Sequence, residues 1–79
     1  MSDQAESWLR EQGLPTCRVR YHKGDLARIE VPLDGLARLS VPDIRAALTE
    51  YFHSLGFKFI TLDLEGFRSG SLNALLKIT

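Results

Sequence analysis

The sequence predicts a small two-layer α+β domain with the element order α-β-β-α-β. Two neighbouring stretches alternate apolar and charged side chains, which is typical of half-buried antiparallel strands. A later stretch, residues 40–55, carries apolar residues at helical spacing. The chain has 79 residues, so we expect one domain over residues 1–79, with a three-stranded, mainly antiparallel sheet and helices on one face.

The first element expected is an N-terminal helix that ends at Gly13 and Pro15, which are residues typical of helix ends. A hairpin follows, with strands at residues 16–22 and 26–31 and a tight turn at Lys23-Gly24. Both strands keep a period of two, so each places one row of side chains toward the core and one row toward solvent.

The second half of the chain contributes a helix and a third strand. Residues 33–39 read as a short helical turn, and Ser40 and Asp43 have capping-box spacing ahead of the main helix. Residues 57–64 are rich in β-forming side chains and too short for another helix, so they form the third strand. Residues 65–71 form a loop by composition.

Both long helices are expected to pack on one face of a sheet with the strand order 2-1-3. In this arrangement a single core would bury the following side chains together: Trp8, Val19, Tyr21, Ile29, Ile44, Leu48 and Phe52.

Composition argues against several function classes. The formal net charge is zero, whereas a general nucleic-acid binder needs a basic excess. No apolar run approaches the roughly 20 residues of a membrane span, and the N-terminus lacks a signal-peptide core, so the cytoplasm is the expected location.

Cys17 is the one cysteine and cannot form an internal disulfide. We expect no metal and no cofactor, because metal sites need several ligands.

The outer face of the predicted hairpin is the first candidate site. It carries the charged side chains of both strands: Arg18, Arg20, His22, Arg28 and Glu30. Arg18 and Arg20 are alternate residues about 7 Å apart, so their guanidinium groups can converge on one carboxylate or phosphate. The other interpretation is the ordinary solvated face of an antiparallel sheet.

The loop Gly66-Phe67-Arg68-Ser69-Gly70-Ser71 is the second candidate site. Its glycines allow the backbone to approach a ligand, and the hydroxyls of Ser69 and Ser71 can line an anion nest with Arg68 as the cation. The loop lacks the Gly-Lys-Ser/Thr ending of a Walker loop. An ordinary Gly/Ser turn is the alternative.

The remaining chemistry-bearing residues are interpreted as structural. Cys17 alternates with Val19 and Tyr21, which indicates a small, buried, inert side chain. His22 and His53 have no nucleophile or metal ligand at a useful spacing.

One stretch carries a family resemblance. Residues 56–73, GFKFITLDLEGFRSGSLN, resemble the C-terminal end of the ATP-dependent sacrificial sulfur transferases of the LarE type, within the PP-loop pyrophosphatases. Residues 18–31, RVRYHKGDLARIEV, and the opening helix at residues 5–10 are similar to the same domain. The resemblance covers nearly the whole chain, and its LDLEGFRSGS block is the specific part.

The resemblance implies that two domains of such a protein have different roles. A separate N-terminal domain carries the PP-loop, binds ATP and adenylates a substrate carboxylate, and a cysteine in the linking region gives up its sulfur. The C-terminal domain adds polar groups to the substrate site, where Arg18, Arg20, Glu30 and Arg68 match the family's motif. This chain has no PP-loop, so we expect no ATP chemistry from it, and Cys17 does not match the sulfur donor.

The sequence therefore favours a non-catalytic ligand-binding or docking module. Its ligand would be a small carboxylate or phosphate, its partner a PP-loop domain, and its binding residues Arg18, Arg20, Glu30, Arg68, Ser69 and Ser71. The alternative is a structural, self-associating domain, or a fragment of a larger sulfur transferase, whose arginines pair with Glu30, Asp63 or Glu65. No independent enzyme activity, nucleic-acid partner or membrane partner is expected.

Overall fold

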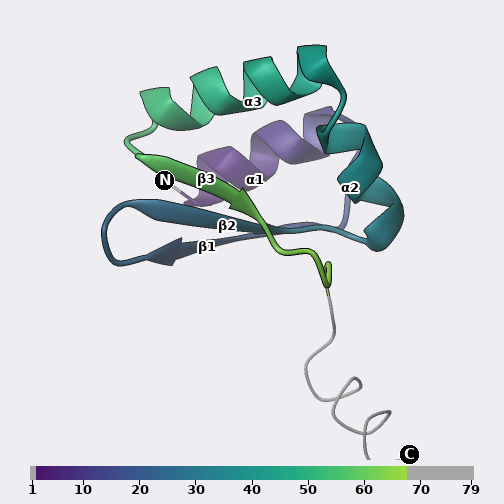
Figure 1. Ribbon diagram of the computed structural model, residues 1–79, viewed down its shortest axis with the longest axis horizontal. Helices are drawn as coiled ribbons and strands as arrows, with labels where there is room; N and C mark the ends of the chain where they lie inside the picture. The colour runs from purple at the N-terminus through teal and green to yellow at the C-terminus, as the bar shows by residue number, and fades with distance from the viewer. Residues whose placement is uncertain (1, 68–79) are drawn as a thin grey trace, which may run out of the picture.

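The computed structural model describes residues 2–67, which form the predicted α+β domain (Figure 1). The elements are α1 (Ser2–Glu11), β1 (Arg18–His22), β2 (Leu26–Glu30), α2 (Leu33–Leu39), α3 (Pro42–Ser54) and β3 (Phe59–Leu62). The predicted order is confirmed, and so is the short helical segment at Leu33–Leu39. Within residues 2–67, no helix is long and apolar enough to cross a membrane.

The sheet is mixed, and β2 lies in the middle of the order β1-β2-β3. β1 pairs with β2 in antiparallel orientation, and β2 pairs with β3 in parallel orientation. The expected order 2-1-3 is therefore wrong. The chain leaves β2, crosses over through α2 and α3, and returns as a parallel strand beside β2.

The outer edge of β1 is occupied by α1, because the Glu6 carboxylate accepts a hydrogen bond from the Val19 N–H at 2.8 Å.

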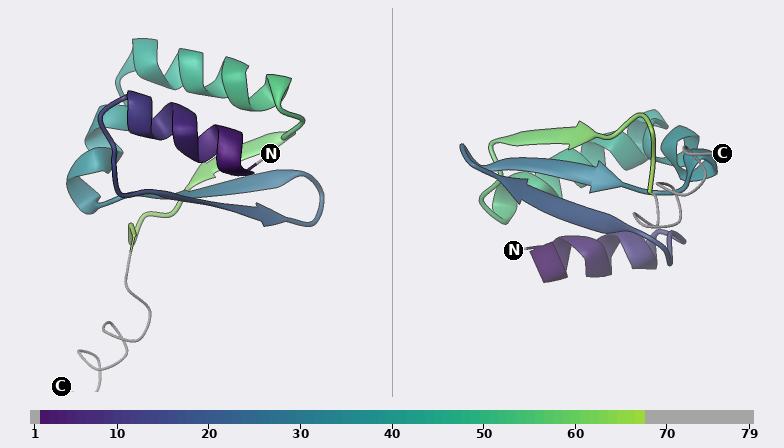
Figure 2. Two further views of the ribbon diagram at one scale, coloured as in Figure 1. Left: turned by 180° about the vertical axis from the view of Figure 1, so that it is seen from behind. Right: turned by 90° about the horizontal axis from the view of Figure 1, so that it is seen from below.

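Both long helices lie on one face of the sheet, and no helix formed by residues 2–67 lies on the other face (Figures 1 and 2). α1 packs against β1, and α3 packs against β3. Val19 and Ile29 point toward the helices and are buried, whereas Arg18 and Arg20 on the opposite face are exposed. The predicted phase of the hairpin is confirmed, and a slip of one residue would have reversed it.

The core lies between the sheet and the two long helices. Phe52 and Phe57 are fully buried at its centre, with ring centroids 5.7 Å apart. Trp8 and Ile44 are partly buried against this core. The other buried apolar side chains are Ala5, Leu9, Leu14, Val19, Ala27, Ile29, Val31, Leu39 and Leu48.

Tyr21 departs from the predicted core, since it is 48% exposed. It lies near the hairpin turn, where its hydroxyl donates a hydrogen bond to Asp25 Oδ1 at 2.6 Å. The ring still contacts Phe57, with centroids 6.0 Å apart. An amphipathic side chain at the end of a sheet can thus cover the core with its ring and keep its hydroxyl in solvent.

The start of α3 also differs from the prediction. Val41 is the N-cap residue, and it makes no side-chain capping hydrogen bond. The Ser40 hydroxyl instead donates to the carbonyl oxygen of Leu36 at 2.9 Å, so it belongs to the end of α2. The capping role expected for Ser40 is wrong, because α2 and α3 follow each other almost without a linker. Pro42 stands in the first turn of α3, where its fixed φ suits the helix.

The turn after β3 is fastened to the end of β2. The N–H of Asp63 donates to the Ile29 carbonyl at 2.9 Å, and the N–H of Phe67 donates to the Val31 carbonyl at 2.7 Å. Gly66 lies between them with φ +79°, and a Cβ atom there would stand 2.8 Å from the Val31 oxygen. The positive φ and the close Val31 oxygen both require glycine at this position. The turn thereby brings the chain back beside β2.

Candidate functional site

The candidate site lies on the helix-free face of the sheet. We call it the arginine face and define it as Arg18, Arg20, Arg28, Glu30 and Asp63. The register of β1 and β2 places Arg18 opposite Glu30 and Arg20 opposite Arg28. Asp63 follows β3 directly, and its backbone bond to Ile29 brings it beside the end of β2. The structure therefore brings together three of the predicted site residues: Arg18, Arg20 and Glu30.

Glu30 is the centre of the arginine face and is only 7% exposed. Its Oε1 atom accepts a hydrogen bond from Arg20 Nε at 3.4 Å, and its Oε2 atom accepts one from Arg28 Nη2 at 3.1 Å. A buried carboxylate requires such partners because burial penalises an unpaired charge. Glu30 therefore holds two guanidinium groups from neighbouring strands. Each of these contacts uses one nitrogen, so each guanidinium group keeps further N–H donors.

Arg28 also approaches a second carboxylate. Its Nε atom lies 3.9 Å from Asp63 Oδ2, which is an ion-pair distance but too long for a hydrogen bond. That Nε atom is buried and has no hydrogen-bond partner among residues 2–67. The sequence placed Arg28 on this face, but Arg28 is not among the predicted binding residues. Its position between two carboxylates follows from the strand register and from the turn after β3.

Arg18 differs from the other two arginines. Its side chain is exposed and forms no ion pair with any residue in the described part of the chain. The arginine face combines three guanidinium groups with two carboxylates, so one positive charge is in excess. A face with this balance can attract an anion, and its guanidinium groups have the planar geometry that suits carboxylate and phosphate.

The predicted residues Arg68, Ser69 and Ser71 lie outside the described residues. The last described residue is Phe67, whose N–H bonds to Val31, the residue that follows Glu30. Of the predicted Gly/Ser loop, only Gly66 and Phe67 belong to the described residues, and Phe67 lies beside the end of β2 that carries Glu30.

The other candidate groups have structural partners. The Cys17 thiol is partly buried and donates weakly to the Glu6 carbonyl oxygen, with the sulfur 3.6 Å away. Partial burial, followed by the negative charge of Glu6, raises the pKa of this thiol. His53 Nδ1 lies 2.9 Å from the Phe57 carbonyl oxygen, an interaction that ties the end of α3 to the core. Within residues 2–67, no cluster of three potential metal ligands is present.

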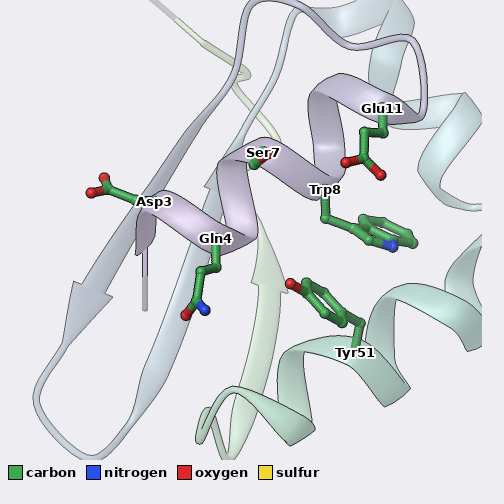
Figure 3. A pocket seen from close by; sticks show the side chains of 6 residues that line it. All are labelled: Asp3, Gln4, Ser7, Trp8, Glu11 and Tyr51. Atoms are coloured by element: carbon green, nitrogen blue, oxygen red, sulfur yellow. The ribbon is translucent and has the colours of Figure 1, made fainter.

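Sequence reasoning missed a shallow groove between α1 and α3 (Figure 3). Trp8 and Tyr51 stack at its floor, with ring centroids 5.9 Å apart and planes at 21°. The groove has a volume of about 410 Å³, and polar side chains surround it: Asp3, Gln4, Ser7 and Glu11. Trp8 was expected in the core and Tyr51 belongs to the apolar stripe predicted for residues 40–55, but only the packing of the two helices brings them together. The groove lies on the helical side of the sheet, away from the arginine face.

Comparison with known proteins identifies relatives much longer than this chain. No protein-family model matches it. The chain is 48% identical over 69 residues to a pyridinium-3,5-bisthiocarboxylic acid mononucleotide synthase of Lactiplantibacillus plantarum, a match that covers 87% of this chain and 24% of the synthase. It is 40% identical over 73 residues to an uncharacterized protein of Synechocystis, covering 92% of this chain and 27% of that protein.

The chain thus spans about a quarter of the length of the curated relatives it matches. The predicted resemblance is confirmed: the matched region is a C-terminal part of a LarE-type protein. The chain is therefore similar to a sulfur transferase, and its described residues have an α+β fold.

Proposed function

We propose that this chain acts as the non-catalytic, ligand-binding domain of a larger LarE-type sulfur transferase, next to a PP-loop domain that uses ATP. The match to about a quarter of the synthase supports a part of such an enzyme rather than the whole. The described residues agree with a supporting role, because the raised pKa of Cys17 keeps its thiol protonated and poorly nucleophilic at neutral pH.

The arginine face is the proposed ligand site. The observation that carries this proposal is the contrast between Arg18, which has no ion-pair partner in the described chain, and Arg20 and Arg28, which Glu30 holds in place. Glu30 thereby preorganises two guanidinium groups beside a third that is available to a ligand. Arg68, Ser69 and Ser71 remain part of the proposal, since they follow Phe67 in the sequence and the Phe67 N–H bonds to Val31 at the end of β2.

The proposed ligand is an anion that carries carboxylate and phosphate groups. The name of the related synthase describes a mononucleotide with two thiocarboxylic acid groups on a pyridinium ring, and both the phosphate and the thiocarboxylate groups are anionic. Guanidinium groups bind carboxylate and phosphate in bidentate fashion. In this role the face binds and orients the substrate, while the proposed PP-loop domain performs the chemistry.

One observation favours a second candidate function. Arg20 and Arg28 both pair with Glu30, and Arg28 also approaches Asp63, as a purely structural face would require. Under this alternative the ion pairs hold the sheet, and Arg18 is an ordinary solvated side chain. The two candidate functions differ in whether Arg18 contributes to the binding of an anion.

The test is a titration of the 79-residue chain with inorganic phosphate and with a pyridine dicarboxylate, followed by calorimetry or by backbone amide NMR shifts. We expect Arg18→Gln to weaken binding about tenfold, the effect of losing one charge-assisted hydrogen bond. Arg45→Gln, on α3, is the matched control and should bind like the parent. Binding should also weaken as salt screens the charges. A parent that binds neither anion, or an equal loss in both variants, would reject the ligand site and favour the structural alternative.

A further inference from the structure

The groove between α1 and α3 continues into a second hollow. This second hollow has a volume of about 280 Å³, and its lining residues are Ala47, Glu50, Tyr51 and Ser54, all on α3. Tyr51 also lines the groove shown in Figure 3, so the two hollows meet at its ring. We call the two hollows together the α1–α3 track. It is separate from the arginine face, which lies on the other side of the sheet.

The charge of the α1–α3 track is negative throughout. Its charged lining residues are Asp3, Glu11 and Glu50, and none of the described residues that line it is basic. Within residues 2–67 these three carboxylates form no ion pair, in contrast to Glu30, which two arginines hold. Their charge is therefore available to a group from outside the domain.

The aromatic pair of the track favours the same sign of partner. The faces of aromatic rings carry partial negative charge and attract cations, and the rings of Trp8 and Tyr51 are both only partly buried. Glu11 follows Trp8 by three residues on α1, so its carboxylate belongs to the same face of the helix. The Tyr51 hydroxyl forms no hydrogen bond with another described residue and can accept one. The track thus combines aromatic surface with hydrogen-bond acceptors.

A guanidinium group matches both features at once. It is planar and can stack on an aromatic ring while its N–H groups donate to a neighbouring carboxylate. An ammonium group is compact and strongly hydrated, and it lacks the planar surface that stacks on a ring. The chemistry of the track therefore selects arginine over lysine.

We propose that the α1–α3 track binds an arginine-bearing segment of a partner protein. A small-molecule site encloses most of its ligand, whereas this track is shallow and extends on both sides of Tyr51. A peptide segment can lay one arginine beside Glu11 and Trp8 and another beside Glu50. The excess positive charge of the arginine face repels the same segment and directs it to the helical side of the sheet. This docking role does not depend on the anion site.

Trp8 is the single tryptophan of the chain, so its fluorescence reports on the track directly. The probe is an end-blocked pentapeptide with arginine at its second and fourth positions and glycine elsewhere. We expect it to change the Trp8 emission saturably. The same peptide with the neutral isostere citrulline should leave the emission unchanged, and a lysine peptide should bind more weakly. No change with the arginine peptide, or equal changes with the citrulline peptide, would overturn the proposal.

Three variants with the same loss of charge separate the track from general electrostatic attraction. Glu11→Gln and Glu50→Gln should each weaken binding of the arginine peptide about two- to fivefold, the range of an exposed ion pair. Asp34→Asn, on α2 and outside the track, is the control and should bind like the parent. All three side chains are exposed, so the variants should fold. Equal losses in the three variants, or no loss for Glu11→Gln and Glu50→Gln, would refute the docking site.

Discussion

The carboxylate of Glu6, on α1, accepts a hydrogen bond at 2.8 Å from the backbone N–H of Val19, on the outer edge of β1. A helix side chain thereby satisfies a strand donor that has no partner in the sheet. The contact fixes α1 against the sheet and closes the edge on which a third strand could otherwise have added.

Glu6→Ala should lower the free energy of unfolding by about 1–3 kcal/mol, because the part-buried N–H of Val19 loses its acceptor. Glu6→Gln keeps an amide oxygen at the same place and should cost less. Glu11→Ala, an exposed position on the same helix, is the control and should stay within about 0.5 kcal/mol of the parent. Urea unfolding measures all three. Equal losses for Glu6→Ala and Glu11→Ala would show that the hydrogen bond adds nothing.

Gly66 and Gly24 form a matched pair of glycines with positive φ, at +79° and +91°. A Cβ on Gly66 would stand 2.8 Å from the Val31 oxygen, whereas a Cβ on Gly24 would have no atom within 4 Å. Gly24→Ala should therefore cost only the backbone term of about 1–2 kcal/mol, and Gly66→Ala should cost more by about 1–3 kcal/mol of strain. Thermal or urea unfolding distinguishes them. If both variants lose the same stability, the turn at Gly66 does not pack closely against the Val31 oxygen.

The faces of the strands were predictable from the sequence, but their lateral order was not. A period of two determines that Val19 faces the helices and that Arg20 faces away, whatever lies beside the strand. Whether β3 joins β1 or β2 depends on which edge is free. That depends on the contact of Glu6 with Val19, which involves a single backbone N–H and leaves no periodic signal.

The same limit applies to the candidate site. Arg18, Arg20 and Glu30 could be placed on one face because they alternate with core residues. The ion pair of Arg28 with Asp63 could not be predicted from the sequence. It requires both the parallel pairing of β2 with β3 and the turn after β3. Tyr21 shows the reverse case: its phase is correct, but its position beside the hairpin turn leaves it exposed.

Glu30 should contribute to stability as the shared acceptor of two arginines. Glu30→Gln leaves Arg20 and Arg28 opposite each other without the buried negative charge between them, and we expect a loss of about 1–3 kcal/mol in the free energy of unfolding. Glu50→Gln, on an exposed part of α3, is the control. An unfolding series in urea gives both values. A Glu30→Gln variant as stable as the parent would mean that Glu30 does not hold the two arginines.

The reactivity of Cys17 should depend on pH in a direction that the structure determines. Partial burial and then the charge of Glu6 raise the thiol pKa above its ordinary value of 9.0, while Arg10 and Arg18 oppose this shift. A raised pKa favours the protonated thiol in the folded state. Its contribution to stability is therefore present below pH 9.0 and is lost as the pH rises through the higher folded pKa.

Because the thiolate is the reactive form, the folded chain should be alkylated by iodoacetamide more slowly than the urea-unfolded chain at mildly alkaline pH. Glu6→Gln should move the pH profile of alkylation to lower pH, since it removes a negative charge but keeps a hydrogen-bond acceptor for Val19. Arg18→Gln should move the profile to higher pH, because Arg18 lowers the thiol pKa. Intact-mass measurement of the alkylated fraction gives each rate. If Glu6→Gln and Arg18→Gln shifted the profile in the same direction, the two charges would not act on Cys17 as the structure requires.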